Sequence, residues 1–142
     1  MRLIVLDTNV LVSAGIKPEG APAKLILDWV LEGQIQAVTC PGIVEEYREV
    51  ARRPKFRRYG FPPYWLEFVI DESLHLPDPI LWPNLGPDPK DMPFLALAHM
   101  AGAWLVTGNL KHFPEAVRND VRVLSPTDYL AHLSEGQQRE SR

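Results

Sequence analysis

Short apolar runs alternate with amphipathic stretches along this chain. The apolar runs, rich in strand-forming residues, cover 2–6, 35–39, 103–107 and 121–124, with a shorter one at 74–76. Between them, apolar residues recur three or four positions apart, which predicts helices. Such an alternation of strands and helices is typical of a parallel sheet with helices on both faces. The pattern therefore predicts an α/β fold.

Proline and glycine mark where the predicted helices begin and end. Helices are expected from near Val10, over 23–31, from Pro41 to about 53, from Pro62 to about 72, over 91–101 and over 126–133. Proline suits the first turn of a helix, because the N–H groups of that turn have no partner within the helix. Five prolines between residues 77 and 89 predict a loop. We therefore expect one domain over 1–133 and a disordered polar tail over 134–142.

Composition narrows the class of protein without naming an activity. The 142 residues are 46% hydrophobic and 23% charged, as in ordinary globular domains. The apolar runs are too short to cross a bilayer and the first residues lack a signal peptide, so we expect a cytoplasmic protein without a membrane span. Cys40 alone forms no internal disulfide, and no cysteine–histidine cluster has zinc spacing. The net charge of −3 argues against wholesale non-specific binding of nucleic acid, but not against a local basic patch.

Asp7 directly follows the first apolar strand and is itself followed by Thr8 and Asn9. In parallel sheets, ligands bind just beyond the carboxyl ends of the strands, so a carboxylate at this position is placed for chemistry. The alternative is that Asp7 only caps the following helix, a role for which aspartate is favoured. Asp7 by itself does not decide between the two interpretations.

Helical geometry singles out two further acids. On the helix from Pro41, Glu45 and Glu49 point away from the apolar face, whereas Glu46 lies on its border and can reach a cleft beside the sheet. On the helix over 91–101, Asp91 falls within about 40° of the centre of the apolar face. A buried charge needs a partner, so Asp91 is either a cap or a functional group. Each acid alone favours a structural role, but three acids converging on one cleft favour function.

Several carboxylates in one cleft repel one another and resist ionising together. A hard divalent cation removes this conflict, because Mg²⁺ and Mn²⁺ prefer oxygen ligands. A metal site of this kind activates water and supports the hydrolysis of phosphodiester bonds. The chain contains no P-loop, no GxGxxG turn and no nucleophile–histidine arrangement that would suggest another chemistry.

Four stretches occur in order along the chain: LIVLDTNVL at 3–11, PGIVEEY at 41–47, DPKDMPFLALA at 88–98 and VTGNLKHFP at 106–114. Together they resemble the PIN-domain family, of the kind found as VapC-like ribonuclease toxins in prokaryotic toxin–antitoxin pairs, over about residues 2–130. By this resemblance Asp7, Glu46 and Asp91 form the acidic core of a Mg²⁺- or Mn²⁺-dependent ribonuclease. The resemblance also implies a three-layer α/β/α sandwich around a mostly parallel five-stranded sheet, a homodimer, an antitoxin partner and RNA as the substrate.

Asn109 departs from the family pattern, since many relatives carry an acid at this position after a Thr-Gly pair. Asparagine is a neutral oxygen donor and a weaker metal ligand, which leaves a second metal ion and high activity open. We include Asn109 among the candidate catalytic residues, the alternative being a plain turn at 108–109. Thr8, Asn9 and Thr107 are candidates for orienting the Asp7 carboxylate or a metal-bound water.

A basic segment follows Glu46 and places six cations within eleven residues, 48–58, with Phe56 and Tyr59 nearby. Such a segment can contact phosphates and stack bases. The candidates for RNA contact are Arg52, Arg53, Arg57 and Arg58. The alternative is a solvated, charged helix end without a binding role.

The sequence thus predicts a metal-dependent endoribonuclease of PIN type, with two other classes as alternatives. One is a catalytically weak PIN module that binds RNA or a protein partner. The other is a receiver-like phosphotransfer domain with Asp7 as the nucleophile. Against the receiver-like domain, the turn at 7–9 has no second acid and no lysine closes the last strand.

Overall fold

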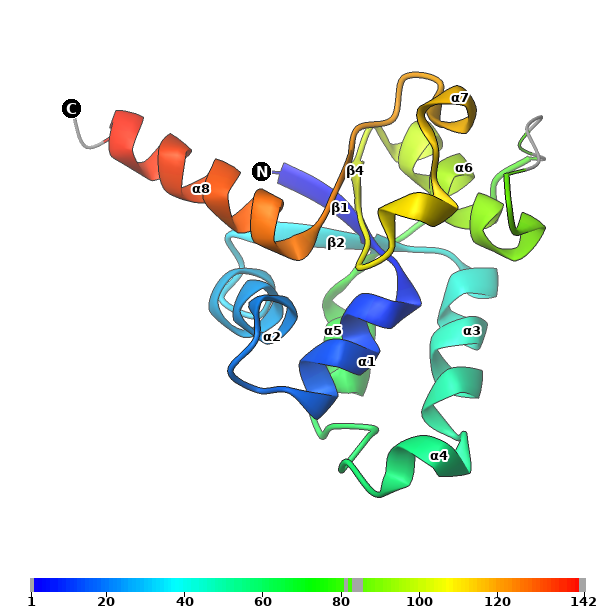
Figure 1. The fold of residues 1–142 in the computed structure, drawn as a ribbon, viewed down its shortest axis with the longest axis vertical. Coiled ribbons are helices and arrows are strands. Elements are labelled where there is room, and N and C mark those ends of the chain that lie inside the picture. The colour runs from blue at the N-terminus through cyan, green and yellow to red at the C-terminus, as the bar shows by residue number, and fades with distance from the viewer. Residues whose placement is uncertain (1, 81, 83–85, 141–142) are drawn as a thin grey trace.

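A central sheet of five parallel strands organises the molecule (Figure 1). The computed structural model describes residues 2–80, 82 and 86–140. In chain order the strands are β1 Arg2–Leu6, β2 Ile35–Thr39, β3 Leu74–His75, β4 Trp104–Val106 and β5 Val123–Leu124. Their order across the sheet is β3-β2-β1-β4-β5. Helices cover both faces, so the predicted α/β/α sandwich with a parallel five-stranded sheet is confirmed.

The helices divide between the two faces as the strand order requires. Their bounds are α1 Thr8–Ile16, α2 Ala21–Leu25, α3 Pro41–Ala51, α4 Pro54–Arg57, α5 Leu66–Glu72, α6 Met92–Ala101, α7 Glu115–Arg118 and α8 Pro126–Glu140. In Figure 1, α1, α2, α3 and α5 lie below the sheet, whereas α6 lies above it. Crossovers between parallel strands are right-handed, so reversing direction across the sheet after β3 moves the next helix to the opposite face. The last helix, α8, packs against α2.

The central strand β1 has the apolar character expected of a strand covered on both faces. Ile4, Val5 and Leu6 are at most 1% exposed. Leu6 pairs with Val106 of β4 in parallel register, and the N–H of Asp7 donates to the carbonyl of Val106 over 2.9 Å. Consequently the residues that follow β1 and β4 emerge side by side at the same edge of the sheet. Across the described residues, no helix is long and apolar enough to cross a membrane.

Several helices differ in their bounds from the sequence prediction. The helix expected over 23–31 consists of α2 followed by a π-helical turn, Ile26–Val30. It ends before Gly33, whose φ angle is 80°. The helix expected from Pro62 begins only at Leu66. Two short 3-10 turns, η2 Pro89–Asp91 and η3 Leu110–His112, adjoin the candidate site. Local pattern indicates the apolar face of a helix but not its first and last turns, which depend on tertiary contacts.

The C-terminal segment also differs from the expected disordered tail. The last helix, α8, continues to Glu140, so residues 134–140 are helical, while 141–142 lie outside the described residues. Tyr129 and Leu133 anchor the first turns of α8, since both are at most 1% exposed. The polar residues after Leu133 include glutamate, glutamine and arginine, which have good helix propensity. Extending a helix from an anchored turn requires no new nucleation, so the polar end remains helical.

Candidate active site

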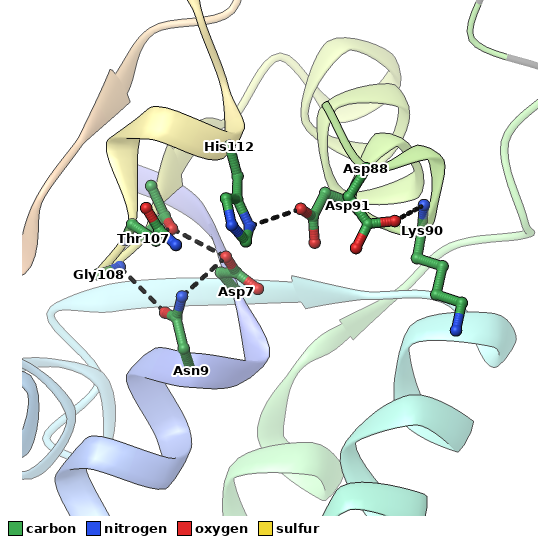
Figure 2. Close-up of polar contacts among 9 residues, drawn as sticks. Asp7, Asn9, Asp88, Lys90, Asp91, Thr107, Gly108 and His112 are labelled. Carbon is green, nitrogen blue, oxygen red and sulfur yellow. Dashed lines mark hydrogen bonds and ion pairs between the residues drawn. The ribbon is translucent and has the colours of Figure 1, made fainter. Parts of the chain in front are cut away.

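Asp7 lies at the carboxyl edge of the sheet, where β1 ends and α1 begins. Its side chain is buried, with the residue only 5% exposed. One carboxylate oxygen, Oδ2, accepts hydrogen bonds from Oγ1 of Thr107 at 2.8 Å and from Nδ2 of Asn9 at 3.2 Å (Figure 2). Asp7 occupies the position that caps α1, but its side chain makes no capping hydrogen bond. The interpretation of Asp7 as a simple helix cap is therefore wrong, whereas the expected roles of Asn9 and Thr107 in orienting its carboxylate match these contacts.

Two further hydrogen bonds fix the side chains of Asn9 and Thr107, the residues that donate to Asp7. The N–H of Gly108 donates to Oδ1 of Asn9 at 3.0 Å, and the N–H of Asn109 donates to Oγ1 of Thr107 at 3.0 Å. A Cβ atom at Gly108 would lie only 3.3 Å from Oδ1 of Asn9, so this approach favours glycine. The turn after β4 and the first turn of α1 are thus joined around the Asp7 carboxylate.

Glu46 reaches the same edge from α3. It is half-buried, and its carboxylate accepts a hydrogen bond from the hydroxyl of Thr8. Thr8 therefore orients Glu46, not Asp7 as expected from the sequence. The adjacent Tyr47 is buried, and its hydroxyl donates to the carbonyl of Leu6 over 2.6 Å. This bond ties α3 to the end of β1 and so sets the position of Glu46 relative to Asp7.

Asp91 approaches from the other face of the sheet, just before α6. Its carboxylate does not cap the helix. Instead, Oδ2 lies 2.8 Å from Nδ1 of His112, an ion-pair distance without hydrogen-bond geometry (Figure 2). Among the described residues, this buried oxygen has no hydrogen-bond partner. The short turn η2 before this helix is capped by Asp88, whose Oδ1 accepts from the N–H of Lys90 at 2.9 Å.

The three acids share one electrostatic environment. Burial raises the pKa of Asp7, and the charge of Asp91 adds to this effect, while the hydrogen bond from Thr107 opposes it. Burial likewise raises the pKa of Glu46, with a further contribution from Asp7. The pKa of Asp91 is raised by burial, and Glu46 contributes, although His112 opposes the shift. Each carboxylate thus makes it harder for another to ionise, as expected for acids that converge.

The carboxylates of Asp7, Glu46 and Asp91 are the right ligand type for a hard divalent cation, but they are not spaced to hold one ion together. Within the described ranges, no group of three or more Asp, Glu, His or Cys side chains is placed to hold one ion. The donors are nonetheless carboxylate oxygens, the ligands that Mg²⁺ and Mn²⁺ prefer. Oδ2 of Asp91 is buried with the ring of His112 at 2.8 Å, and such an ion would give this oxygen a further partner. Because Mg²⁺ usually keeps several waters, the carboxylates need not all touch it.

Asn109 and His112 complete the edge on the β4 side. Asn109 is half-buried and precedes η3, and in the described part of the chain its side chain makes no hydrogen bond, including no helix cap. It therefore remains available to a ligand. Sequence reasoning assigned no role to His112. The spacing could have indicated it, because His112 follows Asn109 by three residues and side chains three apart in a 3-10 helix lie on the same side.

The basic segment lies apart from this cluster. Arg52, Arg53, Arg57 and Arg58 are all exposed. In Figure 1, α4 lies at the end of α3 that is farther from the sheet. Since α3 rises about 1.5 Å per residue, Arg52 follows Glu46 by about 9 Å along the helix axis. The structure thus brings the predicted acids, Thr8, Asn9, Thr107 and Asn109 to one edge, with the arginines beyond it.

Comparisons with known proteins agree with this architecture. A sequence model of the PIN domain matches residues 3–111. An uncharacterized protein of Methanocaldococcus jannaschii is 33% identical over 111 residues, covering 75% of this chain and 70% of that protein.

Solved structures show the same fold at low sequence identity. VapBC2 from Rickettsia felis, bound to a DNA fragment from its promoter, contains a chain that aligns with a TM-score of 0.58 and 16% identity, over 87% of this chain and 98% of that one. FitAcB from Neisseria gonorrhoeae aligns with a TM-score of 0.55 and 18% identity, over 87% and 97%. At these identities the likeness shows a shared fold.

Proposed function

Because this chain belongs to the PIN domain family, we propose that it is a Mg²⁺- or Mn²⁺-dependent endoribonuclease and the toxin of a toxin–antitoxin pair. PIN domains are generally nucleases. The observation that carries the proposal is the meeting of Asp7, Glu46 and Asp91 at one sheet edge, with pKa values raised by burial and by one another. Such a set of carboxylates suits a cation better than it suits three free charges.

The chain's own residues have separable tasks in this reaction. A bound divalent ion supplies an activated water and neutralises charge at the phosphate. Asp7, Glu46 and Asp91 would hold it. Thr107 and Asn9 keep the Asp7 carboxylate in one orientation, and Thr8 does the same for Glu46. Pre-set carboxylates reduce the reorganisation that ion and substrate binding would otherwise require.

Binding of the RNA strand is assigned to the exposed basic segment. Arg52 and Arg57 make no ion pair among the described residues, whereas Arg53 contacts Glu49 at 3.3 Å. An exposed pair of this kind contributes little and exchanges readily for a phosphate. Tyr59, which is 46% exposed, adds an aromatic surface for a base. The segment would guide the strand toward the acids and supply affinity without sequence preference.

The toxin role implies further partners. The related folds include VapBC2 and FitAcB, which supports an antitoxin as the partner of this chain. We also propose a homodimer, on the resemblance to the family, and action on RNA in the cytoplasm. These assignments extend the nuclease proposal and stand or fall separately from it.

A second candidate function rests on Asn109. With a neutral side chain at the position where many relatives carry an acid, the chain would bind a second ion weakly. It would then serve as a PIN module that binds RNA or a protein partner with little cleavage. A receiver-like phosphotransfer domain is contradicted by the topology, because that fold places β1 between β2 and β3, whereas here β1 lies between β2 and β4.

Metal-dependent cleavage is the test that separates these functions. The full chain would be incubated with end-labelled single-stranded RNA in Mg²⁺, in Mn²⁺ and in chelator. We expect internal cleavage with either metal, no cleavage in chelator, and loss of cleavage in Asp7→Asn. Glu45→Gln, on the exposed side of α3, is the matched control and should cleave like the parent. Binding without metal-dependent cleavage by the parent would support the module instead.

A further inference from the structure

An apolar groove of about 480 Å³ opens beside the acidic edge. It lies between the start of α3, the start of α6 and the loop after β3. Its apolar walls include Ile43, Ile80, Trp82, Met92 and Phe94. None of these five side chains takes part in holding the three acids, so the apolar walls have no role in the proposed metal site itself.

The groove is continuous with the candidate active site. Glu46 lines its wall, and Lys90 and Met92, on either side of Asp91, line it as well. A nucleotide strand with a phosphate at the acids can therefore run past the groove mouth. The first nucleotide beyond that phosphate is the part of the strand that can turn into it.

Two hydrogen bonds fix the walls of the groove in the absence of a ligand. Nε1 of Trp82 donates to the carbonyl of Val117 at 3.0 Å, which fixes the indole. Oδ1 of Asp78 accepts from the N–H of Gly42 at 2.8 Å, which fastens the loop to the first turn of α3. A Cβ at Gly42 would lie 3.2 Å from this carboxylate, so glycine permits the close approach. Both walls are thus held without a ligand.

The polar groups at the rim match a nucleotide. Lys90 is exposed, and among the described residues its ammonium group makes no ion pair, so it is available to a phosphate. The carboxylate of Asp78 also lines the groove and can only accept hydrogen bonds when ionised. Guanine presents two adjacent N–H donors, at N1 and N2, that can share one carboxylate. Apolar walls with a few convergent polar groups are the usual construction of a small-ligand pocket.

We propose that this groove binds one unstacked nucleobase of the RNA strand, next to the scissile phosphate, and that it prefers guanine. This inference rests on the proposed ribonuclease function and assigns its sequence preference. Ile80 and the fixed indole of Trp82 form the contact surface for the base, Lys90 meets a phosphate and Asp78 accepts from the base edge. Proteins that read single-stranded RNA commonly hold splayed bases in this way.

Binding to a cleavage-deficient variant tests the groove separately from catalysis. Asp7→Asn provides the background, so that no RNA is consumed. The probes are short fluorescent single-stranded RNAs that carry guanine, adenine, cytosine, uracil or an abasic site at one position in an otherwise uniform uridine strand. We expect the guanine RNA to bind most tightly and the abasic RNA to bind about tenfold more weakly.

Substitutions then locate the binding. Ile80 is 92% exposed, so Ile80→Ser leaves the fold intact and should weaken binding of the guanine RNA severalfold. Trp82→Ala should weaken it about tenfold, with no effect on the abasic RNA. Phe68→Ala, an exposed aromatic change on α5, is the control and should change neither.

Equal affinity for the guanine and abasic RNAs would overturn the proposal. So would unchanged affinity in both Ile80→Ser and Trp82→Ala, which would leave the groove to a protein segment. Failure of the ribonuclease function would appear differently, as base-dependent binding by the groove without metal-dependent cleavage by the parent chain.

Discussion

The hydroxyl of Thr107 donates a 2.8 Å hydrogen bond to the carboxylate of Asp7 across 100 positions of sequence. The same hydroxyl oxygen accepts from the N–H of Asn109, so its single hydrogen is committed to Asp7. Thr107 is fully buried. One side chain therefore couples the turn after β4 to the acid that follows β1.

Replacing Thr107 with valine keeps the shape but removes this donor. Loss of a hydrogen bond to a buried charged group should cost about 1–3 kcal/mol of the free energy of unfolding at neutral pH. Because the bond from Thr107 lowers the pKa of Asp7, the valine variant should show a higher Asp7 pKa. Chemical denaturation and a carboxyl NMR titration would measure the two effects. Thr107→Ser retains the hydroxyl and should keep the Asp7 pKa of the parent. A valine variant with unchanged Asp7 titration would contradict this account.

Asp91→Asn should nearly abolish cleavage while the fold survives. The amide keeps the size of the carboxylate but removes the charge that would hold the cation, so the rate should fall by orders of magnitude. Because Asp91 makes no capping hydrogen bond, its substitution should not incur the roughly 0.5–2 kcal/mol of destabilisation typical of removing a helix cap. Cleavage and thermal melting of the same preparation would be compared. A variant that cleaves as fast as the parent would exclude Asp91 from the site.

The raised pKa values also predict how stability depends on pH without metal. An acid with a raised pKa is harder to ionise in the folded state than in the unfolded chain, so its ionised form at neutral pH destabilises the fold. This destabilisation is lost as the pH falls from the raised pKa of the folded state to the ordinary carboxyl pKa of the unfolded chain. The apo protein should thus gain stability from this cluster on mild acidification.

Comparison with Asp91→Asn measures what Asp91 contributes, both through its own raised pKa and through its effect on the pKa of Asp7. The variant should have a flatter dependence of melting temperature on pH over that window in chelator, since it lacks one of the shifted groups. Opposite shifts elsewhere, such as the lowered pKa of Asp120 beside His99, are common to both proteins and cancel in the difference. Parallel curves would show that Asp91 titrates normally.

Asn109→Asp should have effects of opposite sign without and with metal. A fourth negative charge at the edge should destabilise the apo protein near neutral pH by repulsion. Added Mg²⁺ or Mn²⁺ should then raise the melting temperature more than in the parent, because binding stabilises by mass action. Gln34→Glu, at an exposed position before β2, is the matched control. Equal metal-induced shifts in Asn109→Asp and the parent would place Asn109 outside the site.

Paired replacement of the exposed arginines should weaken RNA binding regardless of sequence. Arg52→Gln with Arg53→Gln, or Arg57→Gln with Arg58→Gln, should reduce the slope of log affinity against log salt by about one for each phosphate that the variant no longer neutralises. Lys24→Gln, an exposed cation on α2, serves as the control. Unchanged slopes would identify the basic segment as a solvated helix end.

The layers of this fold were determined by local pattern. A wholly apolar run at 2–6 and helical spacing between the strands suffice for a parallel α/β sandwich, because these patterns report which faces are buried. The same reasoning placed Asp7 at a strand end and turned Glu46 and Asp91 toward the sheet. Sequence pattern could not end α8, since its polar extension depends on the anchoring of Tyr129 and Leu133.

What the tertiary structure decided is which groups meet across long distances in the chain. Thr8 pairs with Glu46 across 38 positions, and His112 reaches Asp91 from the turn after β4. The groove beside Glu46 likewise forms where the loop that carries Asp78 meets α3 and the start of α6. A period of apolar residues tells which face a side chain occupies, but side-chain partners depend on strand register and helix placement. Those are set by the packing of the whole core, which no local stretch of sequence contains.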